Sequence, residues 1–371
     1  MRADLADWRQ WLSRGVVLAL AVAAGLAVVL FTWVSDQAIA AFAALRAWSP
    51  WAPLVWTPCC TAALVWITRR HAPGAGGSGI PQVMAALSPQ VPAAQQGLFV
   101  SLRLSVAKLL LVSGGLLGGL AIGREGPSVQ IAAGVMQHAQ RWLPRRSSLN
   151  HDGLLVAGGA AGIAAAFNAP LAGVMFAIEE LTRKIEQRSS GLIIAAIVLA
   201  GLIAVSVFGN ASYFGRLRAD RLTWSHLLPG LLTALCCGLV GGVFSRLLQR
   251  SLLGGSDRFS RWRARFPVRF AFACGLAIAL LGWVSQGATD GSGYEYTRGL
   301  VEGTQASVTA FIIVMEMVDG HSMVLSLIAA ALLASVVSRC ISVPIYHRLA
   351  QAQLARLPAP SDSPTDAKPS P

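Results

Sequence analysis

The sequence predicts an all-α protein that crosses a membrane several times. Of its 371 residues, 54% are hydrophobic and only 13% are charged, whereas globular chains carry roughly 25% charged residues. The run "GVVLALAVAAGLAVVLFTWV", which begins at Gly15, is long enough to cross a bilayer as a helix. It is longer than the apolar core of a signal peptide and contains no cleavage site of the A-x-A kind. We therefore expect a polytopic membrane fold.

Further apolar segments follow along the chain. They cover 15–46, 52–68, 98–122, 128–138, 153–179, 190–208, 226–248, 267–286, 306–318 and 322–340, with a more amphipathic segment at 344–355. Their lengths are uneven, and 128–138 is too short to span a bilayer. Short, glycine-interrupted segments are tolerated in a membrane only where they line a cavity or are buried in protein. This pattern predicts the re-entrant helices of a transporter or channel.

We expect two membrane repeats with short flanking segments. The boundaries are an amphipathic surface segment at 1–14, a first repeat at 15–210, a second at 211–356 and a disordered, Pro/Ser-rich tail at 357–371. "GGSGIPQV" at Gly76 is echoed by "DGSGYEYTRG" at Asp290. Inverted repeats are common in transporters, so this echo favours an inverted repeat.

Charge and cysteine content exclude several classes of protein. The formal net charge of +13 is spread over clusters between apolar segments, such as "ITRRHA" and "DRFSRWRARF". Such clusters are typical of membrane topology signals, so we expect no nucleic-acid partner. All six cysteines lie in or beside apolar runs without C-x-x-C spacing. We expect them to be small buried hydrophobic residues, and we expect no metal site and no cofactor.

Two glycine-rich stretches share one pattern. "GSGIP" runs from Gly77 to Pro81, and "GREGP" runs from Gly123 to Pro127. Glycine frees the backbone, and proline is favoured in the first turn of a helix. The amide-rich start of such a helix attracts anions, and Ser78 adds a hydroxyl donor. The carboxylate of Glu125 could take the place of an anion there and leave on protonation. The alternative is that Glu125 only stabilises the start of its helix.

A third stretch, "GIAAAFNAPLAGVMFAIEE", ends in two glutamates, the second of which is Glu180. The basic linker "LTRKIEQR" follows. Taken alone, this pattern favours solvated charges at a helix end, paired with Arg183 and Lys184.

Together the three stretches resemble the CLC family of chloride channels and proton/chloride exchangers. The two glycine motifs match letter for letter, and Glu125 and Glu180 stand 55 residues apart, as the family's two proton-carrying glutamates do. "SRCISVPIYHRLA" resembles its last helix, and "TAFIIVMEM" resembles its penultimate region. Lys108 falls where the family often has a buried lysine. The resemblance covers about residues 15–355.

The resemblance implies roles for individual residues. Glu125 would be the gate and external proton acceptor, and Glu180 would transfer protons on the internal side. Glu180 favours H⁺/Cl⁻ exchange over a passive, voltage-gated type of channel, and serine at 78 favours chloride over nitrate. The chain would form a homodimer in a cell membrane, expected to be a bacterial inner membrane. The chloride-binding residues would be Ser78, Gly79, Ile80, Arg124, Gly126 and Tyr346.

The sequence departs from the family in one place. The family's G-x-F-x-P stretch, which opens another helix at the anion site, does not occur. "YEYTRGLVEGT" runs directly into "QASVTAFIIVMEM", so that the join falls near 302–307 and Ser307 replaces the family's proline. Either lipid, water or a partner chain fills the missing wall, or the chain transports nothing.

One alternative comes from another class. "GGSG" contains the G-x-S-G pattern of a serine nucleophile, which would need a histidine such as His321 or His347 to activate it. We expect a transporter rather than an enzyme.

Overall fold

The computed structural model describes residues 8–143, 150–181, 190–209, 227–254, 257–287, 289–291 and 324–355. All regular structure within these ranges is helical. Five of the described helices are long and apolar enough to cross a membrane, which confirms the predicted all-α, polytopic class. The apolar stretches concerned are Trp11–Trp48, Gln96–Leu117, Gly191–Phe208, Gly230–Leu253 and Pro267–Val284.

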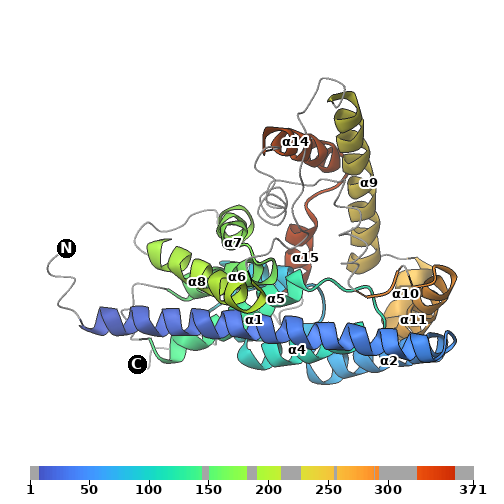
Figure 1. Cartoon of the computed structure of the whole chain (residues 1–371), viewed down its shortest axis with the longest axis horizontal. Coiled ribbons are helices and arrows are strands. Elements are labelled where there is room, and N and C mark those ends of the chain that lie inside the picture. The colour runs from blue at the N-terminus through green and yellow to red at the C-terminus, as the bar shows by residue number, and fades with distance from the viewer. Residues whose placement is uncertain are drawn as a thin grey trace, which may run out of the picture.

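The first half of the chain packs around one buried helix. α6 (His151–Ala166) is buried from Gly153 to Ala165 and contacts α1, α5, α7 and α8. Its neighbours approach closely because it is rich in glycine and alanine. A Cβ atom on Gly158 would collide with the backbone of α5 at Ala133, 2.7 Å away. These neighbours are α1 (Trp8–Trp48), α5 (Glu125–Gln137), α7 (Pro170–Phe176) and α8 (Ser190–Phe208) (Figure 1). α4 (Leu102–Leu117) packs on α1 and α5, and α2 (Ala52–His71) packs on α1 and α4.

Short helices begin at prolines, as the sequence predicts. α3 (Ile80–Ala86) and α7 each carry proline in the first turn. The apolar segment predicted over 153–179 forms two helices, α6 and α7, rather than one. The chain turns between α6 and α7, where Asn168 has a φ of 55°. This left-handed conformation suits asparagine better than most residues, and Pro170 then opens α7.

The second half contains a helix pair that stands away from the first half. α9 (Leu227–Leu253) and α14 (Val324–Ile341) pack on each other and project beyond the layer formed by α1, α2 and α4 (Figure 1). Only 17% of the most apolar window of α9 is buried. α15 (Ile345–Leu354) returns to the first half and packs on α3. This return brings α15 next to the loop that precedes α3.

Two boundaries differ from the sequence-based expectation. The basic cluster "DRFSRWRARF", expected to be a loop, contains α10 (Arg258–Arg265). At its start the carboxylate of Asp257 accepts a hydrogen bond from the amide of Ser260 at 3.0 Å. α1 begins at Trp8 and shows no break at residue 14. The segment 306–318, the join near 302–307 and the tail 357–371 lie outside the described residues.

The cysteines are not buried, contrary to the prediction. Cys59, Cys236, Cys237 and Cys340 are exposed, and Cys60 and Cys274 are partly exposed. An apolar sequence around a residue predicts that the residue is buried in a water-soluble protein. In a membrane helix such a residue can equally well face the lipid.

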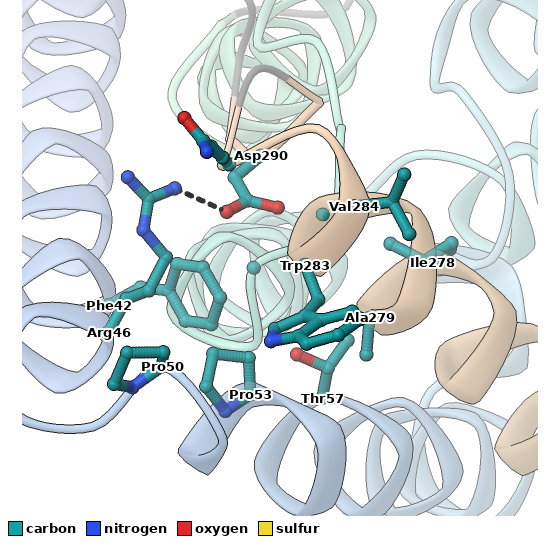
Figure 2. A pocket seen from close by; sticks show the side chains of 13 residues that line it. Phe42, Arg46, Pro50, Pro53, Thr57, Ile278, Ala279, Trp283, Val284 and Asp290 are labelled. Carbon is teal, nitrogen blue, oxygen red and sulfur yellow. Dashed lines mark hydrogen bonds and ion pairs between the residues drawn. The ribbon is translucent and has the colours of Figure 1, made fainter.

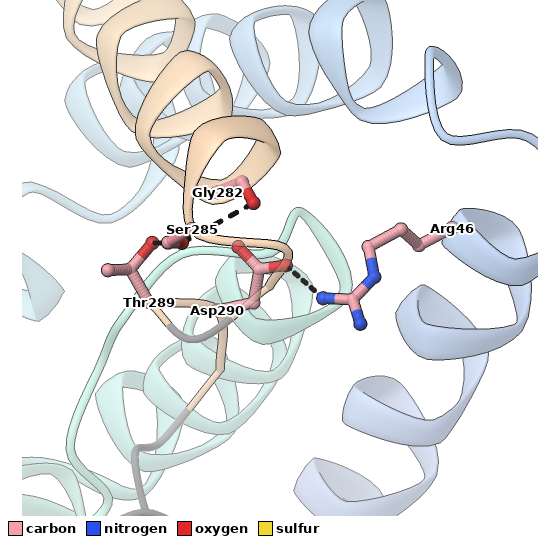
Figure 3. A network of polar contacts seen from close by, with 5 residues as sticks. All are labelled: Arg46, Gly282, Ser285, Thr289 and Asp290. Carbon is pink, nitrogen blue, oxygen red and sulfur yellow. Dashed lines mark hydrogen bonds and ion pairs between the residues drawn. The ribbon is translucent and has the colours of Figure 1, made fainter.

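α11 (Pro267–Val284) joins the second half to the first by packing along α2. Just beyond α11, Asp290 pairs with Arg46 near the end of α1, with Nη1 and Oδ2 2.8 Å apart (Figure 3). Beside this pair lies a cavity of about 620 Å³, whose apolar walls include Phe42, Pro53 and Trp283 (Figure 2). The ion pair therefore ties the end of α1 to the turn after α11.

Candidate functional site

The loop before α3 needs glycine at two positions. Gly77 has a φ of 95° and Gly79 has a φ of 122°, a region that side chains disfavour. The amide of Gly79 donates to Oε1 of Gln82 at 2.9 Å, and Nε2 of Gln82 donates to the carbonyl of Gly76. Gln82 therefore fixes the backbone on both sides of Ser78.

Two buried side chains from neighbouring helices hold this loop. Lys108 on α4 is 1% exposed, and its Nζ donates to the carbonyls of Ala75 at 2.8 Å and Gly77 at 2.5 Å. Gln130 on α5 is fully buried and donates from Nε2 to the carbonyl of Gly74 at 3.0 Å. The expectation that Lys108 is buried is confirmed.

α5 begins at Glu125, directly after a buried arginine. Arg124 is 9% exposed, and its Nη1 lies 2.5 Å from Oδ1 of Asp36 on α1. The carbonyl of Arg124 accepts hydrogen bonds from Ser128, at 2.8 Å from the hydroxyl and 3.0 Å from the amide. The carboxylate of Glu125 folds over Gly123, where a Cβ atom would lie 2.6 Å from Oε2.

The two glycine loops touch each other. A Cβ atom on Gly79 would collide with the carbonyl of Gly126, and one on Gly126 would collide with the hydroxyl and backbone of Ser78. The absence of side chains at both positions is therefore what allows the contact. It places the Ser78 hydroxyl beside the first turn of α5, next to Glu125.

Tyr346 and Glu180 come to the same region from two further elements. Tyr346 lies on α15, which packs on α3, and its hydroxyl is near enough to Glu180 and Glu125 for both carboxylates to act on it electrostatically. Glu180 lies in η4, a single π-helical turn (Ala177–Leu181) that also contacts α3. Ser78, Glu125, Glu180 and Tyr346, which are far apart in the chain, thus lie directly before α3 or on elements that pack against it.

The site is open on one side. Ser78 is exposed, and Glu125, Glu180 and Tyr346 are partly exposed, while the helices behind them are buried. The structure therefore does not enclose the four side chains completely. Arg183 and Lys184 lie outside the described residues, so the reading of Glu180 as a charge paired at a helix end stays open.

The predicted serine nucleophile gains no support from its surroundings. His347 is exposed on α15, and within the described ranges no hydrogen bond joins it to Ser78. His321 lies outside the described residues.

Three residues that shape the site escaped the sequence analysis. Gln82 stands three residues after Gly79, the position from which a side chain caps a helix start, and could have been found. Asp36 is a carboxylate inside a long apolar run, which marks a functional position in a membrane. Gln130 carries no comparable signal, because its role depends on a loop 56 residues earlier.

Comparisons with known proteins concern the family and the fold of the chain. A family model described as "Voltage gated chloride channel" matches residues 60–305, about two thirds of the chain. A slow cyanobacterial Cl⁻/H⁺ antiporter has a similar structure, with a TM-score of 0.69 and 21% identity over 93% of this chain and 98% of that one. A eukaryotic CLC transporter has a TM-score of 0.64 and 19% identity, over 92% of this chain and 74% of that one. A CLC-type fluoride/proton antiporter has a TM-score of 0.58 and 19% identity, over 89% of this chain and 85% of that one.

Proposed function

The chain belongs to the voltage-gated chloride channel family, and from this premise we propose that it carries chloride across a membrane at the point where Ser78, the start of α5 and Tyr346 meet. The observation that carries the proposal is the contact of the two glycine loops beneath α15. Membership of this family indicates a transport protein with several membrane helices rather than an enzyme.

Chloride is bound by hydrogen-bond donors without a full positive charge. The hydroxyls of Ser78 and Tyr346 donate from two sides, and the first amides of α5, at Glu125 and Gly126, have no carbonyl four residues earlier in the helix to bind. α5 has 13 residues, so its dipole favours an anion at this end. From α3, Ile80 contributes its amide, because the amide of Gly79 already donates to Gln82. Arg124 contributes through its place at the start of α5 rather than as a free positive charge, because its guanidinium pairs with Asp36.

Proton/chloride exchange follows from the two carboxylates. Ionised Glu125 competes with chloride for the same donors. Once protonated, it releases them, so that a proton and an anion exchange places. Glu180, which also acts electrostatically on Tyr346, passes protons between this site and the internal solution. In this proposal Glu125 is the gate and Glu180 is the internal proton-transfer residue.

The setting of this transport is a cell membrane, which we propose to be a bacterial inner membrane. The protein acts as a homodimer in which each subunit has its own pathway. α8 and α14, which resemble the family's interface helices, support this arrangement.

The exposure of Ser78 favours a second candidate. A site with one open side holds an anion less firmly, since water competes for the donors. The protein would then be a passive chloride channel or a relative that no longer transports.

Reconstitution into liposomes tests the proposal, with chloride efflux and proton uptake recorded together. The wild type should move both ions, and Glu125→Ala should move chloride without protons. Glu180→Gln should also keep chloride movement and lose proton movement. A matched control is Glu179→Gln, which changes the neighbouring carboxylate in η4.

The outcomes separate the candidates. Proton-coupled flux in Glu125→Ala would exclude the gating role of Glu125. Chloride flux without proton movement in the wild type would identify a passive channel. A folded wild-type protein with no flux would identify a relative that no longer transports.

A further inference from the structure

A groove that does not include the residues of the anion site lies where the ends of three helices meet. It is formed by the C-terminal end of α2, the N-terminal part of α4 and the C-terminal end of α5, and its volume is about 940 Å³. We call it the basic groove. Its lining residues are Ile67, His71, Ala72, Gly97, Ser101, Leu102, Arg103, Leu104, Val106, Ala107, Leu110, Leu111, Gly134, Gln137, His138, Gln140 and Arg141.

The mouth of the basic groove is strongly cationic. Its lining contains two arginines and two histidines, Arg103, Arg141, His71 and His138, and no acidic residue. Within the described part of the chain, no carboxylate forms an ion pair with any of these four side chains. The two arginines create a positive potential that attracts an anion, and the two histidines add hydrogen-bond donors.

The rest of the groove is apolar and faces outward. Val106 is 54% exposed and Leu110 is 62% exposed, one helical turn apart on α4. Because they belong to a helix that is long and apolar enough to cross a membrane, this wall faces hydrocarbon. Trp66 packs edge-on against His71, with ring centroids 5.9 Å apart, and Trp142 is 67% exposed beside Arg141. Tryptophans gather at the membrane–water interface, so the cationic mouth lies at the headgroup level.

We propose that the basic groove binds an anionic phospholipid, with its phosphate among the four basic side chains and an acyl chain along Val106 and Leu110. A basic pocket between membrane helices matches an acidic headgroup, and the adjoining apolar wall matches a lipid tail. Arg69 and Arg70 end α2 next to His71. Because basic residues concentrate on the cytoplasmic side of membrane proteins, the lipid belongs to the cytoplasmic leaflet.

Native mass spectrometry of the purified full chain tests the proposal, with phosphatidylglycerol and phosphatidylcholine added in equal amounts. The wild type should retain phosphatidylglycerol about tenfold better than phosphatidylcholine, and Arg103→Gln/Arg141→Gln should lose most of this preference. Arg258→Gln/Arg261→Gln is the matched control, because it removes two exposed charges from α10 and should keep the preference. The single variants Arg103→Gln and Arg141→Gln should each lose part of it, which covers the case in which the double variant does not fold.

Three results would overturn the proposal. One is a wild type without preference for the anionic lipid. Another is an equal loss of preference in the α10 control. The third is complete displacement of the lipid by millimolar glycerol phosphate, which would show that the groove binds a free phosphate group rather than a lipid. The readout is lipid retention and not ion flux, so its failure leaves the proposed chloride transport untouched.

Discussion

The ammonium group of Lys108 lies 2.5 Å from the carbonyl oxygen of Gly77, the residue that directly precedes Ser78. A second bond, to the carbonyl of Ala75, completes the attachment of α4 to the loop. Because an amine buried this deeply must place its donors on protein acceptors, Lys108 fixes the loop that presents Ser78.

We expect Lys108→Met to destabilise the protein by about 1–3 kcal/mol, since it leaves the buried carbonyl of Ala75 and the carbonyl of Gly77 without this donor. The melting temperature in detergent measures this effect. Arg261→Gln, which removes an exposed positive charge from α10, should leave the melting temperature unchanged. Equal melting temperatures for Lys108→Met and the wild type would show that water or another side chain replaces the two bonds.

Gly126→Ala should disrupt the contact between the two glycine loops. Its new methyl group would meet the hydroxyl and backbone of Ser78, so one loop must move. Gly230→Ala on α9 is the control, because no atom lies within 4 Å of its added Cβ atom. It should be neutral or slightly stabilising, as alanine favours helix formation over glycine. Similar melting temperatures and similar chloride affinities by calorimetry for the two variants would refute the close contact.

The ion pair between Arg46 and Asp290 should contribute modestly to stability. The side chain of Asp290 is 14% exposed and that of Arg46 is 39% exposed, so the pair is partly screened and its coupling should be about 0.5–1 kcal/mol. A double-mutant cycle with Arg46→Gln and Asp290→Asn measures the coupling. A coupling near zero would mean that the contact shown in Figure 3 does not hold the end of α1 to the turn after α11.

His151, the first residue of α6, should make stability depend on pH. Burial lowers its pKa, although Asp152 and a hydrogen bond to the carbonyl of Ala93 oppose this shift. Because the folded state binds the proton less well than the unfolded state, the protein should lose stability as the pH falls below the unfolded pKa of about 6.5. His151→Gln should weaken this loss between pH 7 and pH 5. Parallel melting curves for the wild type and the variant over that range would contradict the assignment.

The sequence predicted those features that follow from local chemistry. Pro81 and Pro170 open short helices, and the glycine motifs mark the loops that meet. The break at Asn168 was missed because apolar residues continue through it. Hydrophobicity defines which residues avoid water, but it does not determine where a buried chain turns.

Tertiary partners could not be predicted in the same way. The bond between Arg124 and Asp36 joins residues 88 positions apart, and neither motif nor spacing points to it. The exposure of Ser78 also depends on tertiary packing, which the motif around it does not give.

Anomalous X-ray diffraction from crystals grown in bromide tests the central claim most directly, because bromide replaces chloride and can be located by its scattering. The account predicts a bromide peak within hydrogen-bond distance of the Ser78 and Tyr346 hydroxyls, and a second peak beside the first turn of α5 in Glu125→Gln. Crystals that show bromide elsewhere, with none at these two hydroxyls, would contradict it.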